Sequence, residues 1–196
     1  MDKQACREWA KERLSKEKEQ SHYLKSKKTL ANLDELLTQL DAKNILTFIP
    51  MGFEPKVLDI VKTGKNKRRF FVPFMQDVSF KMVPYRLPLK KKRFNIYEAP
   101  YSSYALTKID TAIVPILALD NTHRRIGFGK GMYDRFFETL AYKPTIIFVQ
   151  LTCCYCDSNV TNDYDIKGDY LVTAKKILEL TKATTNDFRT NCSNSW

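Results

Sequence analysis

The glycines of the chain are unevenly placed: three of its six, Gly127, Gly129 and Gly131, occupy alternate positions in one short stretch. Glycine tolerates positive φ and lets another group approach the backbone closely, so this spacing predicts a loop shaped around a ligand. Between a strand and a helix, such a loop directs backbone N–H groups and the positive end of the helix dipole at one point, which suits phosphate. Lys130 adds positive charge, and Asp134 could hold a magnesium ion against the phosphates.

The glycine pattern alone leaves a second interpretation open. Glycine loops after strands also serve only to turn the chain, and this pattern is neither the P-loop nor the spaced dinucleotide-binding motif. Asp134 could likewise be an acidic residue that only complements the dipole of its helix. Phosphate binding therefore needs a second source of specificity.

The elements on either side of the loop support the strand–loop–helix arrangement. Residues 109–120, IDTAIVPILALD, form an apolar run without strict alternation, which predicts a strand buried on both faces of a parallel sheet. Residues 132–142 place apolar side chains at helical spacing.

The rest of the chain alternates between predicted strands and helices. The predicted strands are 44–50, 68–74, 78–83, 109–120, 144–151 and 168–173; the predicted helices are two within 3–40 with Ser15 or Ser21 as possible caps, one over 54–63, one over 132–142 and a short one over 174–180. This order predicts an α/β fold with a mostly parallel sheet and a helical N-terminus. Ligands of such sheets bind beyond the carboxyl ends of the strands, where the glycine loop and Glu54 both fall.

The chain carries 33 Lys and Arg against 22 Asp and Glu, a formal net charge of +11. Two basic runs, KTGKNKRR (62–69) and KKKR (90–93), account for part of the excess and indicate attraction to polyanions. A solvated basic face without a dedicated partner is the alternative. No nucleic-acid-binding motif accompanies the runs, so we do not expect nucleic acid to be a partner.

The cysteines and the N-terminus indicate the compartment. The first residues are charged and no apolar segment is long enough to span a bilayer, so we expect a soluble, cytoplasmic protein. Five cysteines form an odd set, for which reduced thiols are the default expectation. The cluster CCYC (153–156) is spaced too tightly for a zinc site and is expected to have a structural or incidental role.

The length of 196 residues indicates one domain. We expect it to span 1–183, with N-terminal helices over 3–40 and an α/β core over 44–183. The polar composition of 184–196 predicts a loose tail. We expect a monomer.

Residues 114–135, VPILALDNTHRRIGFGKGMYDR, resemble the strongest signature of the 5-formyltetrahydrofolate cyclo-ligase family, also called methenyltetrahydrofolate synthetases. In that signature, a strand ending in VPGLAFD is followed by a spacer and RLGxGxGYYDR. Further similar segments follow in the family's order: FIPMGFE (48–54), RFFVPFM (69–75), NIYEAP (95–100), VQL (149–151) and YDIKGDYLVT (164–173). The chain departs from the family at six positions: the family has glycine at Asn95, Ile116 and His123, phenylalanine at Leu119, tyrosine at Met132 and histidine at Tyr164.

The resemblance implies a fold and an activity. The implied fold is a Rossmann-like, three-layer α/β fold of the NagB/RpiA/CoA-transferase-like kind, with helices on both faces of the sheet. The implied activity is the ATP- and Mg2+-dependent closure of 5-formyltetrahydrofolate to 5,10-methenyltetrahydrofolate, with phosphorylation of the formyl oxygen and release of ADP and phosphate.

The resemblance also implies the site residues. The catalytic residues would be Arg125, Lys130 and Tyr133; the ATP-binding residues Lys3, Arg7, Arg125, Gly127, Phe128, Gly129, Lys130, Gly131 and Tyr133; the folate-binding residues Ile49, Glu54, Phe128, Met132 and Tyr133; and the magnesium ligands Asp134 and Asp165. As alternatives, Lys3 and Arg7 are ordinary exposed helix charges and Ile49 and Met132 are core residues.

A second class of function stays open beside the enzyme. It is a non-catalytic nucleotide- or RNA-binding protein on the same scaffold, in which the basic runs hold a polyanion. Separated carboxylates at Glu54, Asp134 and Asp165 favour the enzyme, because a binding protein has no evident use for carboxylates that face phosphate.

Overall fold

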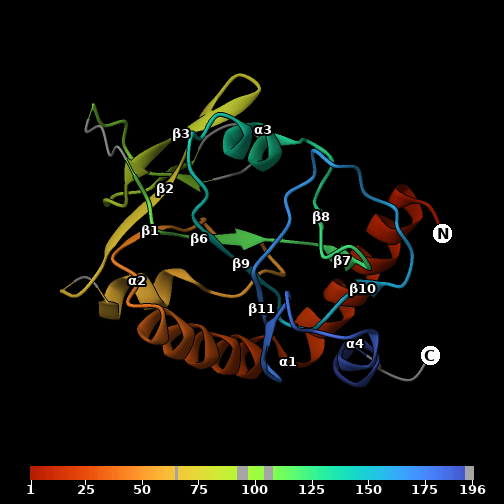
Figure 1. Cartoon of the computed structure of the whole chain (residues 1–196). Coiled ribbons are helices and arrows are strands. Elements are labelled where there is room, and N and C mark those ends of the chain that lie inside the picture. Colours follow the sequence, from red (N-terminus) through yellow and green to blue (C-terminus); the bar gives the residue numbers. More distant parts are fainter. Residues whose placement is uncertain (65, 92–96, 104–107, 193–196) are drawn as a thin grey trace.

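A seven-stranded sheet forms the centre of the computed structural model, which describes residues 1–64, 66–91, 97–103 and 108–192 (Figure 1). The five central strands are parallel, and the strand at each edge is antiparallel to its neighbour. The strands in spatial order are β12 (Ile177–Glu179), β11 (Tyr170–Val172), β9 (Thr145–Val149), β6 (Thr111–Pro115), β1 (Asn44–Leu46), β2 (Arg69–Gln76) and β3 (Ser79–Pro84).

Helices cover both faces of this sheet, as expected (Figure 1). The C-terminal half of α1 (Lys3–Gln39) and α2 (Leu58–Gly64) pack on one face, and α3 (Met132–Glu138) packs on the other. Alternate strand residues feed the two apolar clusters: Ile45 points toward α1 and α2, while its neighbour Leu46 joins the cluster around α3. The predicted three-layer α/β class is confirmed.

The two predicted N-terminal helices form one long helix with a kink at Ser21, where the backbone leaves helical geometry. The kink lets the two halves reach different parts of the molecule. Cys6 and Leu14 of the first half pack near β8 (Arg125–Ile126), whereas Leu33 and Leu37 of the second half pack on the central sheet. The predicted helix over 54–63 begins only at Leu58 and ends at Gly64.

The predicted strand 109–120 is wrong as a single element. It consists of β6 in the main sheet and β7 (Ala118–Asp120) in a second, three-stranded sheet with the order β10-β7-β8, where β10 is Tyr155–Cys156. Pro115, the last residue of β6, has no amide hydrogen to continue the ladder. The next amides bond elsewhere, with Leu117 N–H donating to Ile126 O.

A further pair, β4 (Lys90–Lys91) and β5 (Tyr97–Glu98), is antiparallel.

The C-terminal region differs twice from the sequence prediction. The predicted helix over 174–180 is wrong: the Thr173 hydroxyl accepts the amide of Lys175, the chain reverses, and β12 pairs with β11 as a hairpin. The predicted loose tail is wrong over 185–192, which forms α4 (Thr185–Cys192) around the fully buried Phe188. Residues 193–196 lie outside the described part of the chain.

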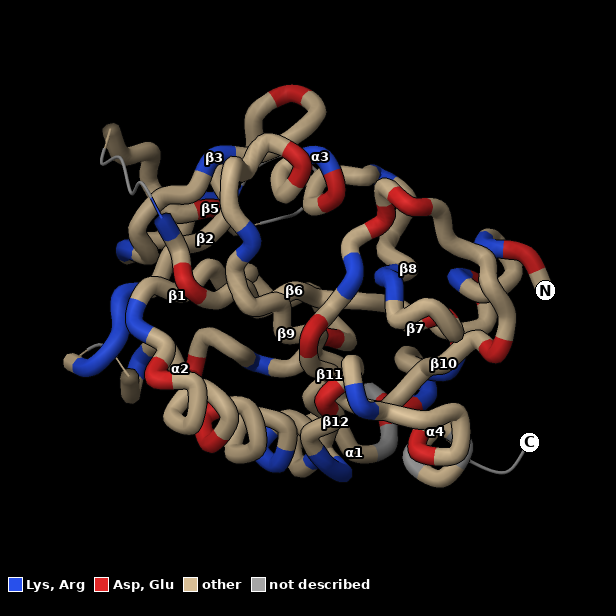
Figure 2. The backbone as a smooth tube through the Cα atoms, in the orientation of Figure 1, with Lys and Arg blue, Asp and Glu red and all other residues tan. Residues whose placement is uncertain are grey.

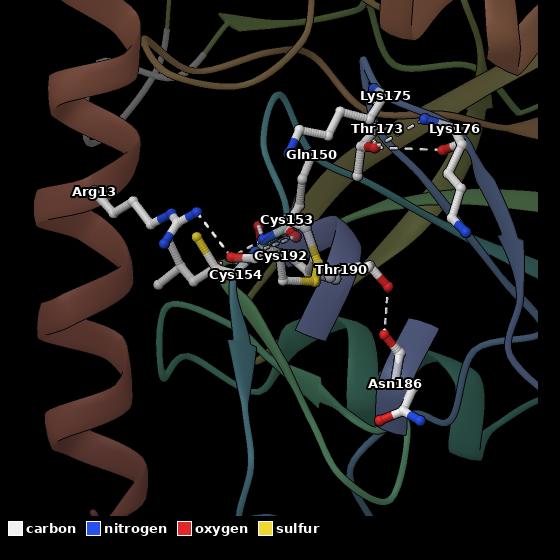
Figure 3. The surroundings of a disulfide bond; sticks show 12 residues. Arg13, Gln150, Cys153, Cys154, Thr173, Lys175, Lys176, Asn186, Thr190 and Cys192 are labelled. Carbon is white, nitrogen blue, oxygen red and sulfur yellow. Dashed lines mark hydrogen bonds between the residues drawn. A yellow bond between two sulfur atoms is a disulfide. The ribbon is translucent and has the colours of Figure 1, made fainter. Parts of the chain in front are cut away.

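Four cysteines form disulfide bonds, so the expectation of reduced thiols is wrong for this structure. Cys6 pairs with Cys156 and Cys153 pairs with Cys192, while Cys154 is a buried free thiol. Figure 3 shows the second bond, beside which Arg13 of α1 donates from Nη2 to the carbonyl of Cys192 (3.1 Å). The segment 153–156 therefore ties both ends of the chain to the second sheet.

None of the helices that the structure describes combines the length and the apolar composition that a bilayer crossing requires.

Candidate active site

The three glycines of the loop between β8 and α3 are each required by local geometry. Gly129 (φ 93°) and Gly131 (φ 62°) lie in the left-handed region, which side chains rarely adopt. A Cβ on Gly127 would lie 2.5 Å from Cζ of Arg125, so any other residue would displace this guanidinium from its place under the loop. The loop is therefore built around a buried cation, which is more than a chain reversal requires.

A cavity of about 310 Å³ opens beside this loop. Residues far apart in the sequence line it: Lys3 and Arg7 from α1; Arg125 from β8; Gly127, Gly129, Lys130 and Gly131 from the glycine loop; Asp134, Arg135 and Glu138 from α3; and Tyr164 and Asp165 from the loop before β11. We call it the charged cavity.

The N-terminal turns of α1 are fixed to the charged cavity by two contacts. Arg7 Nε donates to the Gly127 carbonyl (3.0 Å), and Lys3 Nζ forms an ion pair with Asp165 Oδ2 (2.5 Å). Lys3 and Arg7 thus face the cavity, although they lie more than 100 residues from its other residues in the sequence.

Two carboxylates face the same cavity. Asp134 Oδ1 accepts a hydrogen bond from the amide of Ile166 (3.2 Å). Asp165, which precedes Ile166 in the sequence, accepts one from the amide of Asn162 (2.7 Å). Among the described residues, no three acidic, histidine or cysteine side chains form a group that could hold a metal ion unaided. Magnesium is usually bound by one or two carboxylates together with substrate phosphates, so this pair fits that ion.

Arg125 forms the wall between the charged cavity and a second cavity, and lines both. Arg125 is 6% exposed, and its Nε donates a hydrogen bond to Pro115 O (2.9 Å). Its guanidinium lies 5.0 Å from the ring centre of Tyr133, and its Nη1 lies 3.7 Å from Asp134 Oδ2. Burial lowers the pKa of Arg125, and the charges of Asp134, Tyr133 and Glu54 oppose this effect. An arginine stays protonated under such conditions, so the wall carries a fixed positive charge.

The second cavity has mostly apolar walls, and we call it the apolar cavity. All five predicted folate-binding residues line it. The complete lining is Phe48, Ile49, Met51, Glu54, Pro73, Met75, Phe80, Tyr97, Glu98, Pro115, Arg125, Phe128, Met132 and Tyr133.

Glu54 places a buried carboxyl group in the apolar cavity. It is 5% exposed, and Oε2 accepts the amide of Met51 (2.7 Å), whereas buried Oε1 has no hydrogen-bond partner among the described residues. Burial raises the pKa of Glu54 to about 7, against the opposing effects of the Met51 amide and Arg125. The kinked part of α1 holds this loop, because His22 Nε2 lies 3.1 Å from Glu54 O and Ser26 Oγ accepts the amide of Lys56 (2.9 Å).

Tyr133 lines the apolar cavity and lies against Arg125, which lines both cavities. Its ring packs edge-on against Phe80 with centroids 5.1 Å apart, and burial raises its pKa. The hydroxyl therefore stays protonated and can donate a hydrogen bond at neutral pH.

The structure distributes the predicted ATP-binding residues over both cavities. Seven of the nine line the charged cavity, whereas Phe128 and Tyr133 line the apolar one. Sequence reasoning missed Glu138 and Tyr164 in the charged cavity and Glu98 in the apolar cavity. For Glu98 a signal existed, because it lies in the segment NIYEAP that resembles a family loop.

The basic runs lie in different places. The described residues of the run 62–69 line neither cavity, and Arg68 and Arg69, with Arg86, line a separate surface hollow. The Lys and Arg positions between α2 and β2 lie on the side of the molecule away from the N-terminus (Figure 2). The second run begins in β4, which pairs with β5 so that Lys90 and Lys91 lie opposite Glu98 and Tyr97 of the apolar cavity. The last two residues of this run, 92 and 93, lie outside the described residues.

Comparisons with known proteins give three similarities. Residues 1–173 match the 5-formyltetrahydrofolate cyclo-ligase family. The chain is 26% identical over 140 residues to a 5-formyltetrahydrofolate cyclo-ligase of Mycoplasma genitalium, covering 70% of this chain and 76% of that protein. Its structure is similar to those of two 5,10-methenyltetrahydrofolate synthetases: from Aquifex aeolicus (TM-score 0.77, 23% identity, 94% of this chain and 96% of that chain) and from Mycoplasma pneumoniae (TM-score 0.68, 22% identity, 89% and 99%).

Proposed function

The chain belongs to the 5-formyltetrahydrofolate cyclo-ligase family, and from that premise we propose that it uses ATP and magnesium to close 5-formyltetrahydrofolate to 5,10-methenyltetrahydrofolate. ADP and phosphate are the other products. The observation that carries the proposal is the shared wall at Arg125, which separates a cavity suited to phosphates from an apolar cavity that holds a buried carboxyl group.

The reaction needs such a pair of adjacent cavities. The formamide oxygen of the substrate is a poor leaving group, so ring closure with direct loss of this oxygen is slow. Transfer of the terminal phosphoryl group of ATP to the formyl oxygen makes the carbon electrophilic and turns the oxygen into part of a good leaving group. Nitrogen N10 of the folate then attacks the carbon, loses its proton, and phosphate departs. The protein's part is mainly positioning and neutralisation of charge.

In the charged cavity, Lys3, Arg7, Arg125 and Lys130 offset the negative charge of the phosphates, and Gly127, Gly129 and Gly131 let the backbone approach them. Asp134 and Asp165 would hold magnesium, which would neutralise further phosphate charge.

In the apolar cavity, Ile49, Phe128 and Met132 contact the faces of the pterin ring, and Glu54 lies at the formyl end beside Arg125. Tyr133 keeps its proton and donates to the oxygen that receives the phosphoryl group. Because the positive charge of Arg125 is fixed in the wall, it needs little reorganisation when negative charge develops during the transfer.

The second basic run is the better placed of the two to attract the acidic glutamate tail of folate. Its Lys90 and Lys91 are exposed and lie opposite residues of the apolar cavity, whereas the run over 62–69 lines neither cavity. This placement supports the β4 lysines as the site that receives the tail.

The test is the appearance of the methenyltetrahydrofolate absorbance after purified protein is mixed with 5-formyltetrahydrofolate, ATP and magnesium. We expect a rise that requires ATP and that falls by about a hundredfold or more in Asp134→Ala. The matched control is Asp163→Ala, because Asp163 is fully exposed nearby and does not line the cavity. No rise from folded wild-type protein that binds ATP would favour the alternative, a non-catalytic nucleotide- or RNA-binding protein.

A further inference from the structure

Glu98 is a second buried carboxylate in the apolar cavity, and the roles assigned above do not use it. It lies in β5, is 7% exposed, and lines the cavity together with Glu54. Its side chain has no hydrogen bond or ion pair with any residue that the structure describes, and neither of its oxygens is among the fully buried unpaired atoms, so the carboxylate reaches the cavity. Its register partner in β4, Lys90, is exposed and forms no ion pair with it among the described contacts.

A carboxylate that reaches a cavity without a protein partner can bond only water in the free protein. A ligand that displaces this water must supply hydrogen bonds of its own, because burying an unpaired charge is unfavourable. Glu98 therefore does not stabilise the free protein by any contact that the structure describes. A ligand that brings N–H donors into the cavity would supply the missing hydrogen bonds.

The two carboxylates of the cavity lie in different surroundings. Glu54 is close enough to Arg125 for the two charges to interact, so it lies on the side of the charged cavity. Glu98 comes from the short β4–β5 pair, which lies against β2 and outside the main sheet, and no interaction between Glu98 and Arg125 is found among the described contacts. Glu54 thus has a neighbouring positive charge in Arg125, whereas Glu98 has no such neighbour among the described contacts.

We propose that Glu98 binds the adjacent ring N–H and amino group on the edge of the pterin, and thereby selects a substrate that carries both donors. A carboxylate accepts two parallel N–H bonds from such an edge, as it does from an arginine side chain. The inference rests on the proposed function, because it takes 5-formyltetrahydrofolate as the substrate. It makes Glu98 a specificity residue of the folate site.

The test compares Glu98→Ala and Glu98→Gln with wild type, and uses Glu35→Gln, an exposed position on α1, as the matched control. In Glu98→Ala the KM for 5-formyltetrahydrofolate should rise about tenfold or more while the KM for ATP stays unchanged. The melting temperature without ligand should stay the same or rise, because no described contact of the Glu98 carboxylate is lost. Glu98→Gln keeps the shape of the side chain and one acceptor oxygen, so its KM for 5-formyltetrahydrofolate should lie between those of wild type and Glu98→Ala.

A substrate analogue that lacks the 2-amino group separates recognition from packing. Wild type should bind it more weakly than 5-formyltetrahydrofolate, whereas Glu98→Ala should not distinguish the two. An unchanged folate KM in both variants, or equal discrimination against the analogue in wild type and Glu98→Ala, would overturn the inference. A lower melting temperature of Glu98→Ala, together with changes in kcat and in the KM values for both folate and ATP, would indicate a structural role and would also overturn the inference. Failure of wild type to bind or convert folate would instead overturn the proposed function, and this inference with it.

Discussion

At the scale of single residues, the proposed chemistry depends on ionisable side chains that are buried in the walls of the two cavities. Arg125 is enclosed beneath the glycine loop, and Glu54 has a buried carboxyl oxygen with no hydrogen bond among the described residues. The motif around the loop pointed to Arg125, Lys130 and Tyr133 because loop residues are contiguous in sequence. Glu98 was missed although its segment resembles a family loop, because a place in a cavity wall without a protein partner is a property of the fold.

The raised pKa of Glu54 predicts a pH dependence of stability. The folded protein holds this proton up to about pH 7, whereas a glutamate in the unfolded chain has its ordinary pKa of 4.5. Between these values the unfolded state loses its proton first, so this group favours folding at low pH and its contribution is lost as the pH rises through 7. From pH 5 to pH 8, wild type should lose roughly 3 kcal/mol more unfolding free energy than Glu54→Gln.

Urea unfolding of both proteins at the two pH values measures this difference, and an exposed substitution such as Glu35→Gln serves as the control. Equal losses in wild type and Glu54→Gln would contradict the burial of an unpaired carboxyl group at this position.

At the scale of elements, apolar runs predicted the parallel strands well, because strands buried on both faces consist of little else. The same property hid the break at Pro115, since β6 and β7 are equally apolar but belong to different sheets. The hairpin of β11 and β12 depends on a turn at Thr173 that composition does not reveal. For α4 a signal was present: Thr184 and Asp187 exchange backbone and side-chain hydrogen bonds, the spacing of a helix N-terminus.

The position of β4 predicts a selective effect on the folate tail. Replacing Lys90 and Lys91 by alanine should raise the KM for a polyglutamylated substrate roughly three- to tenfold and leave that of the monoglutamate unchanged, because each exposed lysine contributes a modest, salt-screened attraction. The control pair is Lys62→Ala with Lys67→Ala, in the run that lines neither cavity. Steady-state kinetics at low and high salt measure the effect. A larger effect of the control pair would assign the tail to the other basic run.

At the scale of the whole molecule, both ends of the chain meet the segment 153–156. The bond of Cys6 to Cys156 fixes the part of α1 that carries Lys3 and Arg7 to the charged cavity, and the bond of Cys153 to Cys192 fixes α4. The sequence could not pair these cysteines, because 150 residues separate the first two. A single domain over 1–183 and a monomer stay predictions.

The disulfides predict a simple thiol count. Alkylation of protein denatured without reductant should modify only Cys154 of the five cysteines, and reduction should expose the other four. Reduction should also lower the unfolding free energy by roughly 2–4 kcal/mol for each bond. Mass spectrometry gives the count and urea unfolding gives the stability. Labelling of all five cysteines before reduction would contradict these pairings.

The central claim is that the two cavities act together across Arg125 to pass a phosphoryl group from ATP to the formyl oxygen. Substrate labelled with ¹⁸O in the formyl group tests it most directly, with the released phosphate analysed by mass spectrometry. The account predicts that each phosphate released carries the labelled oxygen, in step with methenyltetrahydrofolate formation. Release of the label into water, with unlabelled phosphate, would contradict it.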